Sequence, residues 1–156
     1  MTMNTVDLAR LDRVSTAARA SARLRMNDNL HQMEDVVHRL LNATEPGTYV
    51  QPHRHRTPAK VETVSVLRGR GAVLIFDDRG ELAERAILSP AGPQLVVEIP
   101  AGAWHSLVAL APGTVWFEVK LGPYAAPPPE DVASFAPAPG TPEAARYLAK
   151  MLQLVS

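Results

Sequence analysis

The chain has 156 residues and lacks cysteine altogether, which already excludes several kinds of chemistry. Without thiols there are no disulfides, no thiolate metal ligands, no iron–sulfur clusters and no cysteine nucleophile. Aromatic residues are also scarce, at 5% of the chain, so leucine and valine must supply most of the core. The length suits one domain built around one such core.

A surplus of charge of one sign is missing too. Lysine and arginine together number 16 and aspartate and glutamate together number 16, so the formal net charge is zero. Nucleic acids and anionic membranes bind proteins that carry a basic surplus, so we expect neither as a partner. Apolar runs of about eighteen residues, which a membrane span requires, and the apolar segment of a signal peptide are also absent. We therefore expect a soluble cytoplasmic protein.

Proline is the residue in excess, with 14 in 156 residues. Helix interiors do not tolerate proline at that density, so the composition favours strands and turns. Short alternating segments separated by turns that contain proline or glycine predict an all-β sandwich or barrel. The expected strands cover residues 24–31, 36–43, 48–55, 62–68, 72–76, 82–88, 94–99, 104–110 and 115–121.

Both ends of the chain lack the strand pattern and instead predict helices and coil. Residues 4–20 show helical periodicity, and residues 142–154 predict a helix with Thr141 as its N-cap. A proline-rich coil over residues 124–140 precedes that second helix. For residues 36–43 a helical turn is an alternative to a strand. We expect a helical segment over 1–22, a barrel over 23–122, and a tail with a terminal helix packed on the barrel over 123–156.

Three histidines and one glutamate occur at a spacing typical of metal ligands. Residues two apart in a strand share one face, so His53 and His55 are predicted to point into the barrel together. Glu62 begins the next strand on a face otherwise made of valines, where a lone carboxylate is costly. A metal ion bound by the histidines would be its partner, and His105 would join them from a neighbouring strand.

This mixed set of nitrogen and oxygen donors limits which metal the site would take. Three imidazoles and one carboxylate suit Fe(II), Mn(II), Ni(II), Co(II) or Zn(II), and not calcium or magnesium alone. Four protein ligands also leave one or two positions of the ion open to water or substrate. We therefore expect a divalent first-row transition metal as the cofactor.

The two segments that carry these residues resemble the paired motifs of the cupin superfamily. The first runs from Gly47 to Gly69 and the second from Pro100 to His105. The resemblance implies a single cupin double-stranded β-helix, a jelly-roll barrel, with His53, His55, Glu62 and His105 as its metal ligands. The six residues between His55 and Glu62 exceed the three or four more usual in cupins and lengthen one loop.

More of the chain is similar to one branch, the WbuC-type cupin-fold metalloproteins. The matching stretches are residues 20–31, 37–55, 117–124 and the tail around Phe135. The association of that branch with gene clusters for bacterial surface polysaccharide implies a small sugar-type ligand. Small cupins commonly pair through added strands, so the resemblance also implies a homodimer.

Several further polar residues are candidates for contact with substrate, and each has a plainer alternative. Tyr49 and Gln51 share the parity of the two histidines and would face the same interior, although Tyr49 suits core packing equally. A polar strand face of Arg25, Asn27, Asn29 and His31 lines either the barrel mouth, solvent or a contact between subunits. Near the end of the barrel, either Glu118 and Lys120 or the residues of opposite parity point inward.

Three more residues have the chemistry to bind an anion or to close the pocket. Lys60 lies between the two histidines and Glu62, Arg39 sits among apolar neighbours, and Tyr124 follows a Gly-Pro pair. His38 is expected to face outward because its parity opposes that of Arg39. The candidate catalytic residues are thus Glu118, His31 and Tyr49, and the candidate substrate-binding residues are Gln51, Lys60, Arg39, Asn29 and Tyr124.

Three functions are compatible with this set of residues. The first is a metal-dependent enzyme of the isomerase or epimerase type, in which Glu118 or His31 moves a proton on a small polar sugar-type molecule. The second is Fe(II)-dependent oxygen chemistry, a dioxygenase-type reaction, at the same ligands. The third is a module without catalytic activity that binds a metal or a sugar.

Overall fold

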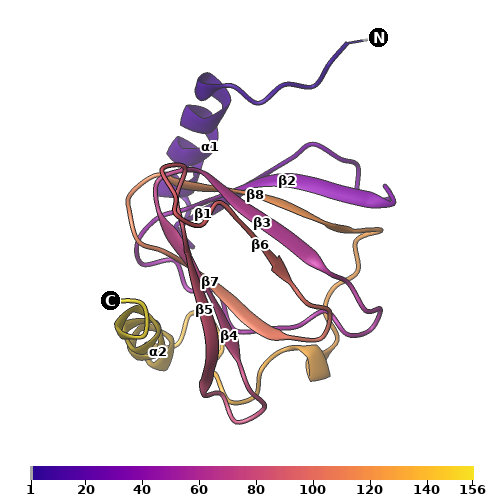
Figure 1. Cartoon of the computed structure of the whole chain (residues 1–156). Coiled ribbons are helices and arrows are strands. Elements are labelled where there is room, and N and C mark those ends of the chain that lie inside the picture. Colours follow the sequence, from indigo (N-terminus) through magenta and orange to yellow (C-terminus); the bar gives the residue numbers. More distant parts are fainter. Residues whose placement is uncertain (1) are drawn as a thin grey trace.

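Two antiparallel β-sheets face each other and enclose the core (Figure 1). The computed structural model describes residues 2–156. The larger sheet has the order β1 (Arg25–Asn29), β2 (Val37–Thr44), β8 (Thr114–Leu121), β3 (Glu62–Arg68) and β6 (Val96–Ile99). The smaller sheet has the order β5 (Leu82–Leu88), β4 (Gly71–Phe76) and β7 (Trp104–Ala109). The predicted all-β jelly roll is confirmed.

Apolar side chains fill one end of the space between the sheets. Trp116 of β8 is fully buried there, among valines and leucines of β3, β4 and β7. A Cβ on Gly71 would overlap the indole of Trp116, so only glycine at that position lets the ring lie between the sheets. The other end of the barrel interior is left to polar side chains, and the candidate site lies there.

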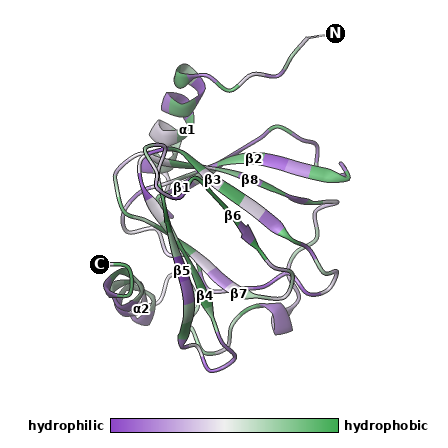
Figure 2. Cartoon of the chain, in the orientation of Figure 1, coloured by the Kyte–Doolittle hydropathy of each residue, from purple (hydrophilic) through white to green (hydrophobic). Residues whose placement is uncertain are grey.

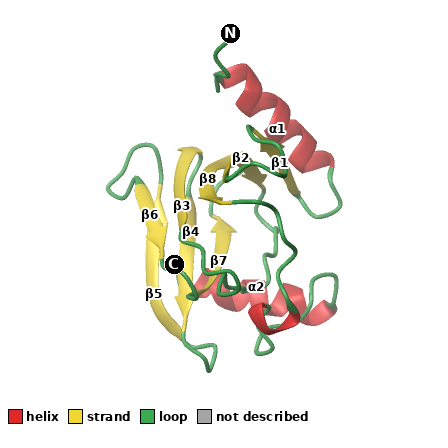
Figure 3. Ribbon diagram, turned by 90° about the vertical axis from the view of Figure 1, so that its right-hand side faces the viewer, coloured by secondary structure: helices red, strands yellow, loops and turns green. Residues whose placement is uncertain are grey.

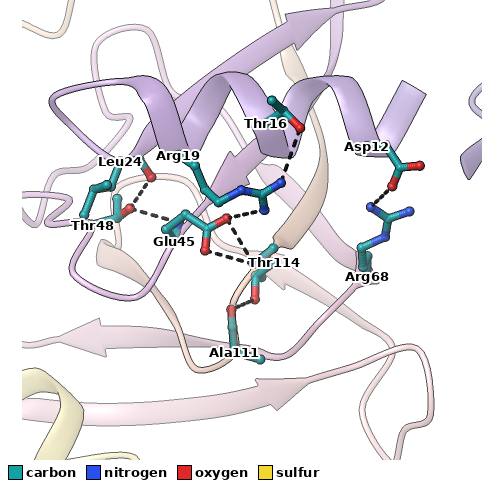
Figure 4. Close-up of polar contacts among 10 residues, drawn as sticks. Asp12, Thr16, Arg19, Leu24, Glu45, Thr48, Arg68, Ala111 and Thr114 are labelled. Carbon is teal, nitrogen blue, oxygen red and sulfur yellow. Dashed lines mark hydrogen bonds and ion pairs between the residues drawn. The ribbon is translucent and has the colours of Figure 1, made fainter. Parts of the chain in front are cut away.

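The first helix, α1 (Leu8–Ala20), covers the outer face of the larger sheet. Asp7 caps it by accepting from the N–H of Arg10, and its apolar side packs on β2 and β8. Arg10 pairs with Asp28 of β1 at 2.6 Å, and two further polar contacts that fix the helix to the barrel are drawn in Figure 4. Arg68 pairs with Asp12 at 2.7 Å, and Arg19 pairs with the buried Glu45 at 3.2 Å. The predicted N-terminal helix is confirmed.

The second helix, α2 (Pro142–Gln153), covers the outer face of the smaller sheet (Figure 3). Thr141 caps it by accepting from the N–H of Ala144, and Pro142 occupies the first turn, as the sequence predicts. The coil before it contains one short 3-10 helix, η1 (Pro129–Asp131). In Figure 2, β4 is mostly green, whereas the edge strand β5 carries a purple stretch. The sequence of β5 includes Glu84 and Arg85.

The structure differs from the sequence-based expectations at two segments, residues 36–43 and residues 48–55. The alternative helical turn at residues 36–43 is wrong, because β2 pairs with both β1 and β8. The strand expected over residues 48–55 is wrong as well, since only His53 forms isolated bridges, to His105 and to Val132. At His53, the backbone of this segment therefore pairs with β7 on one side and with the proline-rich tail on the other. Among residues 2–156, no helix is long and apolar enough to cross a membrane.

Candidate metal centre

Backbone pairing brings the two histidine segments together. The N–H of His53 donates to the carbonyl of His105 at 3.0 Å, and the N–H of His105 donates to the carbonyl of His53 at 2.9 Å. Because the two backbones are paired, their imidazoles meet at the polar end of the barrel, where His55 joins them. One ligand atom from each of the three residues lies within 4.8 Å of the others. The three histidines therefore have the spacing to hold one metal ion.

Hydrogen bonds to carbonyl groups set the tautomer of two of these rings. Nδ1 of His53 lies 3.1 Å from the carbonyl of Gln51, and Nδ1 of His105 lies 2.9 Å from the carbonyl of Ala103. A carbonyl only accepts, so both Nδ1 atoms carry a proton, and Nε2 is the nitrogen that each ring can offer to a metal ion. Burial, and then the charge of His105, lower the pKa of His53 to about 3. The His53 ring is therefore neutral at pH 7, as metal binding requires.

Glu62 completes the cluster from the first position of β3. Its Oε2 lies 3.1 Å from Nε2 of His55 and 3.5 Å from Nε2 of His105, and the residue is 3% exposed. Burial alone would raise the pKa of this carboxyl, but the hydrogen bonds to His105 and His55 and the charge of Lys120 hold it well below its usual range. Glu62 is therefore an anion buried against imidazole nitrogens.

These four side chains fit a transition metal by chemistry and by spacing. Ligand atoms that bind one ion at about 2.1 Å lie about 3 Å apart when their bonds meet at right angles. The separations between Glu62 and the two neighbouring imidazoles are close to that value. A donor set of three nitrogens and one oxygen suits the first-row transition metals named above.

A second carboxylate and a lysine lie beside the cluster. The register of β3 and β8 places Glu118 opposite Val64 and Lys120 opposite Glu62 on the inner face of the sheet. Of the two alternatives for β8, the inward set is thus the one that contains Glu118 and Lys120. Glu118 is 4% exposed, and burial followed by the charge of Glu62 raises its pKa to about 7. The charges of both glutamates outweigh burial and raise the pKa of Lys120, which stays protonated.

The cluster opens into a cavity of about 160 Å³. Asn42 of β2 lies in its wall and donates from Nδ2 to Oε1 of Glu118 at 2.6 Å. Arg25 and Asn27 of β1 also line it, so part of the polar strand face expected to line the barrel mouth does so. The cavity thus combines metal-type ligands, an acid, a lysine and neutral amides in one place.

A second opening of about 190 Å³ reaches the histidines from the side of the tail. Lys60 and Tyr124 line it, together with His38 and Lys120. Nζ of Lys60 donates to the carbonyl of Pro123 at 3.1 Å, and Tyr124 is 60% exposed at the rim. Lys60 and Tyr124, both candidates for substrate contact, therefore stand at the entrance and not beside the ligands.

Tyr49 and Gln51 hold the tail. The hydroxyl of Tyr49 donates to the carbonyl of Pro137 at 2.8 Å. Nε2 of Gln51 donates to the carbonyls of Ala133 and Ala136, at 3.2 and 3.0 Å. The expectation that both face the barrel interior is wrong, because residues 48–55 do not form a regular strand and their parity does not hold. Val50, between them, lines the cavity instead.

His31, Arg39 and Asn29 lie away from the ligands, and none is among the described residues that line the 160 Å³ cavity. Nδ1 of His31 is held by the backbone of Arg39, at 3.0 Å from N and 2.8 Å from O, and its ring stacks on His38. The expected orientations on β2 are reversed. His38 is 4% exposed, whereas the Arg39 side chain points to solvent and pairs with Asp35. Asn29 is exposed.

Sequence reasoning singled out neither Asn42 nor Asp131. Asn42 follows two leucines in β2, and nothing in its spacing distinguishes it. Asp131 lies in the proline-rich tail, yet it is 1% exposed and accepts from Nε of Arg54 at 3.1 Å. It also accepts from the backbone N–H groups of Arg56 and Thr57, at 3.2 Å each. The tail thereby fixes the loop that carries His53 and His55.

Comparison with known proteins identifies the family of this chain and relates its fold to solved structures. A family model described as "Domain of unknown function (DUF6016)" matches residues 6–88. No curated protein sequence matches the chain. Among solved structures, KdgF from Halomonas sp. shares 18% identity at a TM-score of 0.51, over 65% of this chain and 82% of KdgF.

Two further structures are similar. TT1209 from Thermus thermophilus shares 22% identity at a TM-score of 0.55, over 76% of this chain and 97% of that one. The capsular polysaccharide assembling protein CapF from Staphylococcus aureus shares 20% identity at a TM-score of 0.52, over 69% of this chain and 28% of CapF. At these identities the likeness concerns the fold alone, and that fold is the cupin jelly roll.

Proposed function

Because the chain belongs to the DUF6016 family, whose description names no activity, we propose its function from the site itself: a metal-dependent enzyme that acts on a small polar molecule. The single observation that carries this proposal is the convergence of three imidazoles and the Glu62 carboxylate at the wall of a cavity that Glu118 also lines. His53, His55, Glu62 and His105 would hold a divalent first-row transition ion. Such an ion polarises a bound carbonyl or hydroxyl oxygen.

Glu118 is the group placed to move a proton in this cavity. Its Oε1 is held by Asn42 at 2.6 Å, and its Oε2 lies 3.9 Å from Nζ of Lys120. These contacts fix the carboxyl at the cavity wall beside Glu62. A fixed carboxyl beside a polarised oxygen is the arrangement that isomerases and epimerases need. We assign Glu118 as general acid or base, and Lys60 and Tyr124 as contacts at the entrance.

The substrate class follows from the resemblance to the WbuC-type proteins. That resemblance supports a sugar-type molecule and a role in surface polysaccharide biosynthesis. CapF is a capsular polysaccharide assembling protein, but its likeness to this chain concerns the fold. A homodimer and a cytoplasmic location stay predictions from the sequence.

Deuterium exchange tests the proposal without a known reaction. A proton-moving enzyme incorporates solvent deuterium at carbon when sugars and sugar acids are incubated with it in D₂O, which mass spectrometry detects. We expect incorporation by the wild-type protein and a loss of about a hundredfold in Glu118→Gln with the metal content unchanged. Lys150→Gln, which alters an exposed residue of α2, is the control and should exchange at the wild-type rate.

The same four metal ligands are also compatible with a second function. Fe(II)-dependent oxygen chemistry would appear as oxygen uptake that requires added Fe(II). Equal activity under anaerobic conditions with zinc or manganese would count against that alternative. Binding of a sugar without exchange or oxygen uptake would instead identify a module without catalytic activity.

A further inference from the structure

Arg25 stands out among the arginines of this chain. Four arginines are partly buried, and three of them pair with a carboxylate: Arg10 with Asp28, Arg54 with Asp131, and Arg68 with Asp12. The Arg25 side chain has no hydrogen bond or ion pair with any of residues 2–156. A guanidinium withdrawn from water without an acceptor is unfavourable, so its unpaired state at this depth needs a reason.

The position of Arg25 supplies that reason. It lines the 160 Å³ cavity over the metal centre and also the adjoining groove of about 520 Å³, and His53 and Val50 belong to both. Arg25 therefore stands where the groove meets the metal ligands. Its backbone is held in β1 opposite Thr44, so the side chain is anchored at its base and points across the inner face of the sheet.

The anionic groups nearby are already engaged. Oε1 of Glu118 accepts from Asn42, and Oε2 of Glu118 lies 3.9 Å from Nζ of Lys120. Glu62 faces the histidines and Lys120. Lys120 thus pairs with both glutamates, at 3.4 and 3.9 Å, whereas the guanidinium of Arg25 pairs with neither.

A second unpaired group lies in the same wall. Oδ1 of Asn42 is buried and has no donor among the described residues, while the amide nitrogen of Asn42 donates to Glu118. Asn42 lies directly opposite Asn27 in the register of β1 and β2, one inward position from Arg25. The cavity wall therefore holds a guanidinium without a paired acceptor and a buried carbonyl oxygen without a donor, at neighbouring positions of β1 and β2.

We propose that Arg25 binds an oxyanion of the substrate, a carboxylate or a phosphate, and that Asn42 accepts a hydrogen bond from a hydroxyl of the same molecule. This inference rests on the proposed function in taking the metal cavity as the substrate site, and it narrows the substrate to small hydroxylated acids or phosphate esters. The planar guanidinium fork matches two oxygens of either anion at once. A carboxylate and a phosphate would bind the guanidinium in the same way, and separate ligands carrying one or the other distinguish them.

Titration calorimetry with charged and neutral pairs of ligands tests the anion site. Gluconate is compared with glucitol, and glucose 6-phosphate with glucose. We expect wild-type protein to bind at least one charged member about tenfold or more tightly than its neutral counterpart. Arg25→Gln should abolish the preference, and Arg25→Lys should keep part of it. Arg79→Gln, which removes the same charge from the exposed turn between β4 and β5, should keep all of it.

Comparison of glycolate with acetate tests the hydroxyl contact. Wild-type protein should prefer glycolate, and Asn42→Ala should lose that preference. Metal content and melting temperature are measured on every sample, so that loss of the anion preference at unchanged metal content is separated from failure of the metal centre. Equal binding of charged and neutral ligands by wild-type protein, or an undiminished preference in folded Arg25→Gln, would overturn the inference.

Discussion

The buried carboxylate of Asp131 and the guanidinium of Arg54 meet at 3.1 Å although 77 positions separate them in the chain. Arg54 lies between two of the metal-type histidines, and its backbone N–H also donates to the Asp131 carbonyl at 2.9 Å. Its guanidinium stacks 4.0 Å above the ring of Trp104, the residue before His105. The proline-rich tail is thus part of the framework that orients the histidines.

Removing the charge of Asp131 should therefore weaken both the fold and the centre. Asp131→Asn replaces hydrogen bonds to a carboxylate by weaker ones, and charged hydrogen bonds contribute about 1.5–3 kcal/mol each. We expect a loss of about 2–3 kcal/mol in the free energy of unfolding by urea, together with weaker metal retention during dialysis. Asp78→Asn is the matched control, because Asp78 is exposed and 3.9 Å from Arg54. It should cost about 0.5 kcal/mol or less.

The stabilisation from Asp131 should depend on pH in a defined direction. Burial opposes its ionisation, but the hydrogen bonds from Arg54 and from the N–H groups of Arg56 and Thr57 hold its pKa below the usual value. A carboxyl with a lowered native pKa binds fewer protons in the folded state, so stability rises with pH. The difference between wild type and Asp131→Asn should be full above the unfolded pKa of about 3.9 and shrink as pH falls through the native pKa. A difference that grows in acid would contradict this assignment.

Glu45 provides a test of how α1 is attached. Its carboxylate is buried and accepts from the N–H of Gly113 at 3.0 and 3.1 Å and from Arg19 at 3.2 Å (Figure 4). Glu45→Ala would leave the partly buried N–H of Gly113 without this partner, and an unsatisfied buried donor costs about 1–3 kcal/mol. Asp12→Asn, in the exposed pair with Arg68, should cost about 1 kcal/mol or less. The free energy of unfolding by urea is measured for both variants. An equal decrease in the two would contradict a larger contribution from the buried contact.

The sequence predicts most of the fold because the local signals and the tertiary structure agree. Buried valines alternate with polar residues along β3, glycine and proline mark the turns, and Thr141 with Pro142 begins α2 as expected. The spacing of His53, His55, Glu62 and His105 also predicts the residues that the structure brings together. Each of these signals acts over a few residues or through strand parity.

Expectations failed where the backbone bonds to distant parts of the chain. His53 bridges both β7 and the tail, which breaks the strand expected over residues 48–55 and turns Tyr49 outward. On β2 the buried position belongs to His38 because its imidazole stacks on His31, a contact that hydropathy does not encode. Asp131 has no local signal at all, since its partners lie more than 70 positions away.

Metal analysis of the purified protein tests the central claim most directly. Protein expressed in medium replete with first-row metals is dialysed, and its metal content per chain is measured by mass spectrometry for wild type, His53→Ala, His105→Ala and His31→Gln. We predict about one ion per chain in wild type and in His31→Gln, whose imidazole lies outside the cluster. Both alanine variants should lose the ion while staying folded by circular dichroism. Wild-type protein without bound metal, or alanine variants that retain as much as wild type, would contradict the account.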